Sequence, residues 1–140
     1  MVELLVVIGI VGVLAAIALP AYGRYQDRVR TKHAIAEISA IATLITLHSR
    51  ETRDLPGSLS ELGAGGRLDP WGRPYVYYNV EANGRGHARK DHALNPINTD
   101  FDLYSVGPDG QSKPQVSHRQ SVDDLIRAGN GSFVGVAAEF

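Results

Sequence analysis

The sequence has no cysteine, which excludes disulfide bonds, thiol nucleophiles and zinc sites with cysteine ligands. It has little net charge as well, because 14 lysines and arginines nearly balance 15 aspartates and glutamates, for a formal net charge of -1. No overall field of one sign therefore points to nucleic acid or to an acidic partner. Recognisable catalytic motifs are also missing, since the chain contains no G-x-S-x-G, no H-E-x-x-H and no phosphate-binding glycine loop. We therefore expect a protein that is not an enzyme.

Charge is almost absent from the first 23 residues. Glu3 is the one charged side chain before Arg24, and the stretch between them is mostly apolar. A helix of about 20 residues, at ~1.5 Å rise per residue, is long enough to cross the ~30 Å hydrocarbon core of a bilayer. We therefore expect residues 1–23 to form a transmembrane helix segment. Residues 24–140 are expected to form the amphipathic rest of the helix and one globular domain.

The helical pattern continues past the apolar run. Apolar residues recur at spacings of three and four, namely Ile35, Ile38, Ala42 and Ile45. Pro20 lies inside the combined stretch, where its missing N–H and its ring are expected to kink the helix without ending it. The pattern predicts one long bent helix from about residue 2 to residue 53, ending before Pro56 and Gly57.

The second half of the chain changes to a strand-like pattern. Three short runs are aromatic and β-branched, or alternate apolar with polar residues: 74–80, 101–106 and 132–137. We expect an α+β fold in which the long helix packs through its isoleucine stripe on a small three-stranded antiparallel sheet. Two connections, 81–100 and 108–131, are long for such a domain, and loops of this length are often functional.

A turn motif precedes the first strand-like run, in the order Asp69, Pro70, Trp71, Gly72. The Asp69 carboxylate can accept a local backbone hydrogen bond, Pro70 fixes φ, and Gly72 permits the reversal. Trp71 has two interpretations, because it either anchors the turn on the core or is exposed as a subunit contact. We predict a structural role for this turn and not a catalytic one.

Glu3 also has two interpretations. A carboxylate at the end of a membrane helix can mark the water interface. Alternatively, Glu3 enters an apolar environment, where an unpaired carboxylate is too unfavourable and a partner charge must neutralise it. No Lys, Arg or His lies within one helical turn of Glu3. The partner would then come from another chain, and a terminal amino group is the natural candidate.

The stretch from Val2 to Tyr22 resembles the N-terminal segment of the type IV pilin superfamily. In that family a glutamate precedes a helix-bending proline by seventeen residues, as Glu3 precedes Pro20 here. Two later motifs, DPWGRPY at 69–75 and SVGPDG at 105–110, resemble signatures of the major pseudopilin of type II secretion systems. The resemblance implies a subunit that polymerises through its N-terminal helix into a helical filament, with Glu3 paired to the terminal amine of a neighbour. It also implies that Phe-Thr and a basic leader ending in glycine precede Met1.

From the resemblance we further expect a protein that spans the inner membrane once before assembly and then forms a periplasmic or extracellular filament of identical subunits. Its expected partners are the inner-membrane assembly machinery and prepilin peptidase, and its mature N-terminus is expected to be methylated. Pro20 and three glycines of the helix are predicted to allow partial unwinding in the filament: Gly9, Gly12 and Gly23.

Major pseudopilins bind calcium through two aspartate side chains and main-chain carbonyls of one loop, so the resemblance implies a calcium site in this chain. The implied ligands are Asp109, Asp124, Val106 and Gln111, with Asp123 as the alternative to Asp124. Calcium takes about 6 to 8 oxygen ligands in flexible geometry and would pin a loop that has few apolar anchors. Three cations of the same loop could instead pair with the aspartates and replace the metal: Lys113, His118 and Arg119.

Two alternatives to the secretion pseudopilus stay open. They are the main subunit of a surface type IV pilus, and a single-pass membrane protein with a calcium-binding extracytoplasmic domain.

The basic segment 84–92 could contact nucleic acid, but no aromatic residue alternates with its basic residues, so we expect a solvated loop or a subunit contact. Its two histidines, His87 and His92, have no third ligand in view, and we expect no zinc site.

Overall fold

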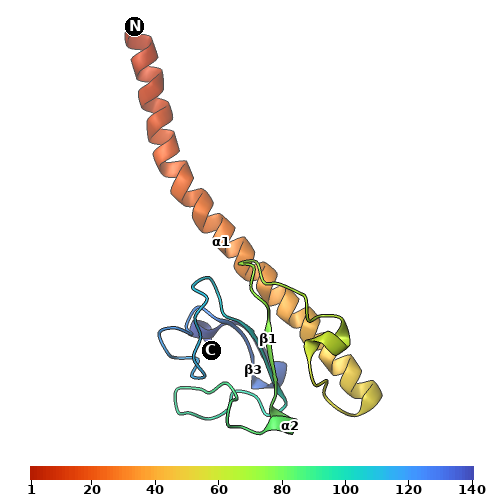
Figure 1. The fold of residues 1–140 in the computed structure, drawn as a ribbon. Helices are drawn as coiled ribbons and strands as arrows, with labels where there is room; N and C mark the ends of the chain where they lie inside the picture. Colours follow the sequence, from red (N-terminus) through yellow and green to blue (C-terminus); the bar gives the residue numbers. More distant parts are fainter. The chain divides into compact units, whose positions relative to one another are not determined.

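The computed structural model describes all residues of the chain, 1–140, and they form two compact units, Met1–Arg30 and Thr31–Phe140. One helix, α1 (Val2–Thr52), begins in the first unit and ends in the second (Figure 1). It is continuous through Pro20, as expected from the helix-forming residues on both sides of the proline. The boundary between the units lies at Arg30, later than the end of the uncharged run at residue 23.

The end of α1 lies close to the predicted residue. Arg53 adopts a left-handed φ of 69°, and its N–H donates to the Ser49 carbonyl at 2.9 Å. A residue in this conformation stops the helix while satisfying one of its last carbonyls. Pro56 follows shortly afterwards and cannot continue the helical hydrogen-bond pattern.

The second unit contains a four-stranded antiparallel sheet whose strands lie in sequence order. The strands are β1 (Val76–Asn79), β2 (Phe101–Ser105), β3 (Leu125–Ala128) and β4 (Phe133–Val136). A single helical turn, α2 (Val80–Asn83), follows β1, and short 3₁₀ turns lie at Leu59–Leu62, Gly129–Gly131 and Ala137–Glu139. The predicted α+β architecture is confirmed, but the prediction of three strands is wrong by one.

The strand that the prediction missed is β3, with the sequence Leu-Ile-Arg-Ala. All four residues are buried, because both faces of the sheet are covered. Arg127 is tolerated at 5% exposure because its guanidinium pairs with the Asp100 carboxylate at 2.6 Å and lies over the Phe101 ring. A short strand that is buried on both faces shows no alternation, and a charged residue in it conceals it further.

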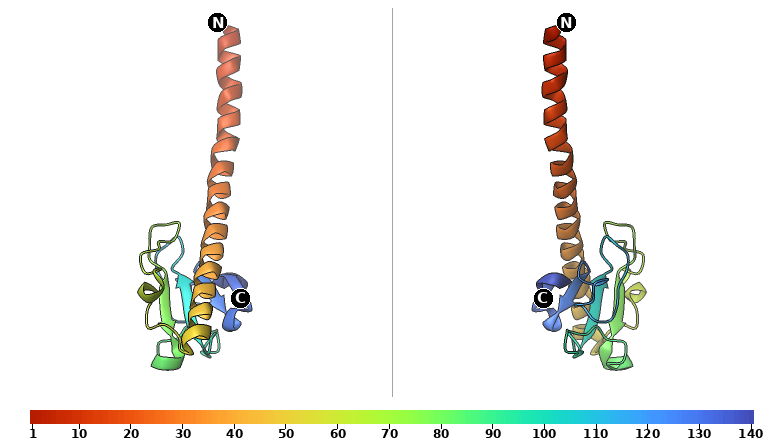
Figure 2. Two further views of the ribbon diagram at one scale, coloured as in Figure 1. Left: turned by 90° about the vertical axis from the view of Figure 1, so that its right-hand side faces the viewer. Right: turned by 90° about the vertical axis from the view of Figure 1, so that its left-hand side faces the viewer.

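The two faces of the sheet have different covers. On one face the C-terminal part of α1 lies alongside the strands (Figure 2). Its side chains pack there on Tyr75, Phe101, Leu103 and Leu125. On the other face, the loop residues Ile97 and Val116 pack against Ile126, Ala128 and Ala137. The long connections are therefore part of a second core and not a fringe around the first.

The buried stripe of α1 differs in part from the predicted one. Its members are fully buried at 0% exposure: Ala34, Ile38, Ile41 and Ile45. The predicted Ile35 and Ala42 are only partly buried and flank this stripe. Both sets have spacings of three and four, so periodicity alone does not say which of two adjacent stripes faces the sheet.

Every buried side chain lies at or beyond Ala34. The first unit contributes none, so the fragment 24–140 retains both parts of the core and all four strands. We therefore expect this fragment to fold on its own.

Candidate functional site

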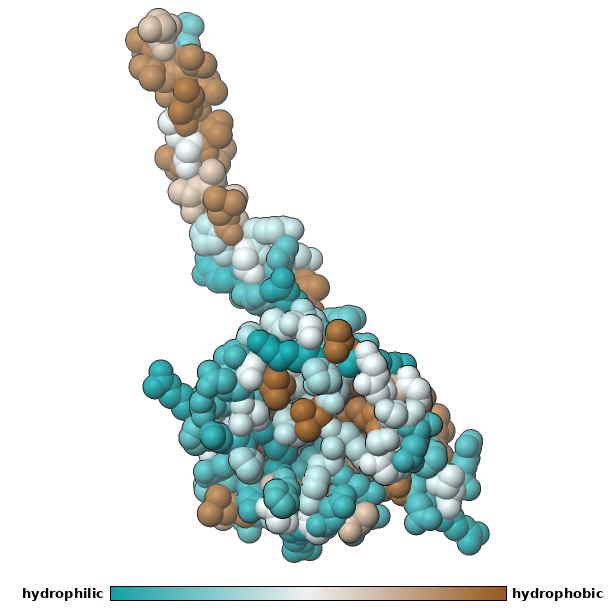
Figure 3. Space-filling view, viewed as in Figure 1, coloured by the Kyte–Doolittle hydropathy of each residue, from teal (hydrophilic) through white to brown (hydrophobic).

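The first unit presents an apolar surface without a partner inside the chain. Its large apolar side chains are exposed, for example Leu4 at 63%, Ile17 at 67% and Leu19 at 72%. Figure 3 shows this segment as mostly brown, whereas the second unit is mostly teal and white. α1 is the one helix of the chain that is long and apolar enough to cross a membrane. Soluble monomers rarely expose so many contiguous apolar residues, so this surface needs lipid or protein around it.

Glu3 lies in the first turn of α1, where the helix dipole favours a carboxylate. It is exposed, and the three ion pairs of the chain involve other residues. Pairing of Glu3 with another chain stays a prediction.

Pro20 and the glycines of α1 lie on the same exposed unit. Pro20 has no N–H, so the carbonyl one helical turn before it lacks its usual donor. A Cβ atom added at Gly9, Gly12 or Gly23 would meet no neighbouring atom within 4 Å. No packing contact within the chain therefore requires these glycines, and unwinding at them in a filament stays a prediction.

In the second unit, Asp69 organises the predicted turn. Its Oδ1 accepts hydrogen bonds from the N–H groups of Trp71 at 3.0 Å and Arg73 at 2.9 Å. Its own carbonyl accepts from Gly72 N–H at 2.9 Å, and Gly72 has a φ of 83° that favours glycine. Pro70 lies between Asp69 and the half-buried Trp71, which packs against the core beside α1. The turn thus has structural contacts for its side chains.

The same aspartate joins the two sequence motifs. Ser105, at the end of β2, donates its hydroxyl proton to Asp69 Oδ2 at 2.6 Å and accepts from Gly107 N–H at 3.1 Å. Arg73 Nη1 donates to the Gly107 carbonyl at 2.7 Å. We call this contact between residues 69–73 and 105–110 the motif junction. Both motifs are visible in the sequence but their contact is not, because the motifs are far apart along the chain.

Asp109 lies at the surface, in the loop that follows β2. Asp109 Oδ1 accepts from Gln111 N–H at 2.7 Å, and Asp109 N–H donates to Asp123 Oδ2 at 3.3 Å. Gly107 has a φ of 66°, and a Cβ there would lie 2.5 Å from the Asp123 carbonyl oxygen. The chain therefore brings Gly107 and Asp109 close to Asp123. For Val106, the carbonyl ligand implied by the resemblance, a role in metal binding stays a prediction.

Asp124 has different surroundings from Asp109. It is completely buried, and its Oδ2 accepts from Arg89 Nη2 at 2.6 Å and from Ser112 Oγ at 2.6 Å. Burial raises the pKa of the Asp124 carboxyl to about 6, although the hydrogen bond from Ser112 and the charge of Arg89 oppose this shift. The cation that pairs with Asp124 is thus Arg89, and not one of the loop cations Lys113, His118 or Arg119.

Arg89 is the residue of this site whose buried ion pair the sequence did not indicate. It belongs to the long connection 81–100, and the sequence showed only that this segment is basic. In the structure Arg89 is 3% exposed, whereas Arg85 and His87 of the same segment are exposed. The backbone around it is paired, since Lys90 N–H donates to Pro114 O and Val116 N–H donates to Lys90 O, each at 2.8 Å. The expectation of a solvated loop therefore holds only for the exposed part of this segment.

A group of three or more His, Cys, Asp or Glu side chains that could share a metal ion does not occur in the chain. The two carboxylates implied for calcium, those of Asp109 and Asp124, have separate hydrogen-bond partners. Calcium in this loop stays a prediction.

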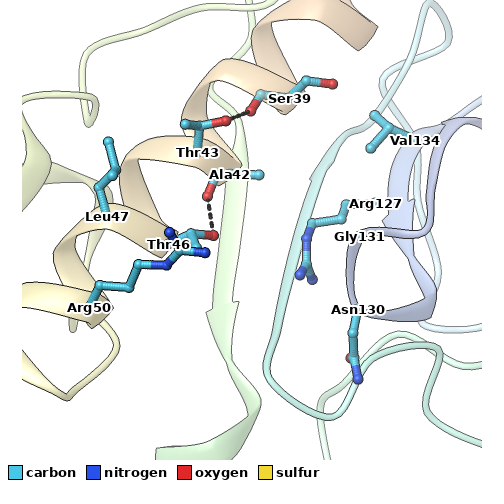
Figure 4. A pocket seen from close by; sticks show the side chains of 10 residues that line it. All are labelled: Ser39, Ala42, Thr43, Thr46, Leu47, Arg50, Arg127, Asn130, Gly131 and Val134. Carbon is cyan, nitrogen blue, oxygen red and sulfur yellow. Dashed lines mark hydrogen bonds between the residues drawn. The ribbon is translucent and has the colours of Figure 1, made fainter.

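A groove of about 440 Å³ lies on the second unit, between α1 and the turn from β3 to β4 (Figure 4). Ser39, Thr43 and Thr46 line one wall, and Arg127 and Asn130 line the other. The three hydroxyls donate to carbonyls one turn earlier in α1, so their protons are already in use. No nucleophile with an adjacent base occurs in this groove, and it offers no catalytic arrangement.

Comparison with known proteins finds relatives of one structural kind. The chain is 27% identical over 132 residues to the type II secretion system core protein G of Pseudomonas aeruginosa. This alignment covers 79% of this chain and 82% of that protein. It is 44% identical over 43 residues to a fimbrial protein of Pseudomonas aeruginosa, covering 31% of this chain and 28% of that protein. It is 33% identical over 84 residues to a fimbrial protein of Neisseria meningitidis serogroup A, covering 60% and 49%.

The chain therefore spans most of the length of the secretion protein but less than half of each of these fimbrial proteins. No family model and no solved structure matches it. None of these relatives is named as an enzyme.

Proposed function

Because the chain belongs to the type IV pilin superfamily and is a structural filament subunit, we propose that it is the major pseudopilin of a type II secretion-like system. The observation that carries this proposal is the similarity to secretion core protein G, which extends over 79% of the chain. The motif junction supports it, because both motifs that resemble the pseudopilin signatures meet in the second unit.

The exposed apolar surface of the first unit supplies the driving force for the proposed assembly. Full burial of a Val, Leu or Ile side chain is worth about 1.5–3 kcal/mol. Even partial burial of this helix among its neighbours therefore contributes many kcal/mol per subunit. The contacts are heterologous, since a head-to-tail operation that does not close generates a helical filament. Glu3 becomes neutralised by the terminal amine of a neighbouring subunit as it leaves water.

The proposed life of the protein has two stages. The helix of residues 1–23 first spans the inner membrane, with the second unit on the periplasmic side, and then moves into the core of the filament. Prepilin peptidase and the inner-membrane assembly machinery are the partners proposed for these stages. The support for a membrane stage is that α1 is long and apolar enough to span a bilayer.

Substitution of Glu3 tests the filament proposal. Glu3→Leu should abolish filament formation, because the helix loses its docking charge, while insertion into the membrane is retained. Glu51→Leu is the matched control, since Glu51 is an exposed acid near the other end of α1. The measurement is the amount of filament after gentle shearing or cross-linking, compared with the amount of membrane-inserted protein.

Normal assembly of Glu3→Leu would contradict the proposal and favour a single-pass regulatory membrane protein. The second candidate is the main subunit of a surface pilus, which the identity of 44% to a fimbrial protein favours. Filaments of this protein sheared from wild-type cells at native expression would support the pilus, whereas a pseudopilus should stay within the envelope.

A further inference from the structure

The connection from β2 to β3, residues 106–124, has few apolar anchors. Val116 is its one buried large apolar side chain, at 4% exposure. A connection of this length loses considerable conformational entropy when it is ordered, so other contacts must hold it. Backbone hydrogen bonds to the segment 81–100 hold its middle, for example from Val116 N–H to Lys90 O at 2.8 Å, and a buried ion pair between Asp124 and Arg89 holds its end.

Arg89 links this connection to two other parts of the domain. Its Nη2 donates to Asp124 Oδ2 at 2.6 Å, and its Nη1 donates to the Lys113 carbonyl at 2.9 Å and to the Ser112 hydroxyl. Its guanidinium carbon lies 4.3 Å from the centre of the Tyr104 ring on β2. One side chain from the segment 81–100 thus contacts the middle and the C-terminal end of the connection 106–124 and a strand of the sheet.

We infer that Arg89 is the structural cation of this loop, and that the chain itself supplies the positive charge which the pseudopilin resemblance assigns to calcium. The guanidinium neutralises Asp124 and binds a main-chain carbonyl of the same loop. Those are the two kinds of oxygen that the resemblance assigns to the metal. The loop is therefore ordered without a divalent ion.

The surroundings of Asp124 do not fit a calcium ion. Its Oδ2 already accepts from a guanidinium and a hydroxyl, and a divalent cation beside Arg89 would be repelled by it. Its Oδ1 is buried without a hydrogen-bond partner, but one free oxygen is far from the roughly 6 to 8 that calcium requires. Asp109, the other implied carboxylate, is exposed and engaged by Gln111 N–H.

The geometry favours arginine over lysine at this position. The planar guanidinium presents several N–H donors in fixed directions, so it reaches Asp124 and Lys113 O together and also stacks on Tyr104. An ammonium group at the same place would satisfy fewer of these partners. Arg89→Lys should therefore recover only part of the contribution of the arginine.

The test compares calcium dependence with Arg89 dependence in the fragment 24–140, which keeps the whole core. Thermal and urea unfolding are followed by circular dichroism in excess EGTA and in millimolar calcium. We expect the unsubstituted fragment to unfold at the same midpoint in both solutions. Arg89→Met should lower the folding equilibrium constant on the order of 100-fold or more, because it leaves the Asp124 charge buried and uncompensated.

Arg85→Met is the matched control, since it removes an exposed arginine from the same segment, and it should leave the midpoint unchanged. The double replacement Arg89→Met with Asp124→Leu should regain most of the lost stability, because an apolar pair can replace a buried ion pair.

A fall in the midpoint of the unsubstituted fragment in EGTA that calcium restores would overturn the inference. Equal midpoints for Arg89→Met and Arg85→Met would overturn it as well. If Arg89→Met does not fold, the calcium comparison on the unsubstituted fragment still decides. The inference concerns the second unit alone, so its failure would leave the filament proposal untouched.

Discussion

Replacement of Asp69 by alanine removes the acceptor that holds the motif junction together. The carboxylate accepts from Trp71 N–H, Arg73 N–H and the Ser105 hydroxyl at distances of 2.6 to 3.0 Å. Hydrogen bonds to charged groups contribute about 1.5–3 kcal/mol each, and a buried donor left without a partner costs about 1–3 kcal/mol. Ser105 is fully buried, whereas water can reach the partly exposed amides. We therefore expect Asp69→Ala to lower the free energy of unfolding by about 3–5 kcal/mol, less than the sum of three separate bonds.

Urea unfolding of the fragment 24–140, followed by circular dichroism, measures this loss. A domain of this size is stable by about 5–15 kcal/mol, so the expected loss is a large part of the total. Asp54→Ala is the control, because Asp54 is exposed and its carboxylate makes no hydrogen bond in the structure. That substitution should change the free energy of unfolding by no more than about 0.5 kcal/mol.

A double-mutant cycle with Ser105→Ala isolates the contact between the motifs. The two residues share a hydrogen bond of 2.6 Å, so their coupling free energy should be about 1–3 kcal/mol. Asp69→Asn should be milder than Asp69→Ala, because it keeps the oxygen that accepts from Trp71 and Arg73. A loss of less than about 0.5 kcal/mol in the free energy of unfolding of Asp69→Ala would contradict this prediction, because the motif junction would then not stabilise the domain.

Two further predictions concern the core and the buried acid of the second unit. Ile41→Ala should lower the free energy of unfolding of the fragment 24–140 by about 2–5 kcal/mol, because Ile41 of α1 is fully buried against the sheet. Leu47 is 49% exposed, so Leu47→Ala should be nearly neutral in the same urea experiment. Burial raises the pKa of the Asp124 carboxyl from its ordinary value of 3.8 to about 6. The folded chain therefore binds the carboxyl proton more tightly than the unfolded chain does, and the contribution of Asp124 to stability falls as the pH rises from about 4 to above 6. The advantage of the unsubstituted fragment over Asp124→Asn, measured by urea midpoints, should therefore be larger near pH 4 than near pH 7, and an advantage that grows with pH would contradict this pKa direction.

The elements that sequence reasoning located correctly are those with long or repeated local signals. α1 was predicted over residues 2–53 and forms over Val2–Thr52, because its apolar run and its period of three and four persist for many turns. The strands β1, β2 and β4 were recognised from aromatic and β-branched residues. β3 was missed because its burial depends on the cover of both sheet faces and on the partner of Arg127, neither of which is visible in four residues.

The candidate site shows the same division. The turn at Asp69 could be predicted, since an aspartate followed by proline and, two residues later, glycine has local backbone preferences. The partner of Asp124 could not be predicted, because Arg89 is 35 residues away in the sequence and other cations lie much nearer. Nothing local distinguishes Arg89 from the exposed Arg85 four residues earlier.

Local sequence signals are enough to indicate the long helix, the apolar segment with its single acid at Glu3, and the two motifs of the second half. These are properties of neighbouring residues, and periodicity, charge and turn chemistry act over a few residues at a time. The contact of Asp69 with Ser105, and the burial of Arg89 against Asp124, arise only in the folded domain. Such pairings depend on how chain segments distant in sequence pack around one sheet, and burial then makes a charge without a partner too unfavourable to persist.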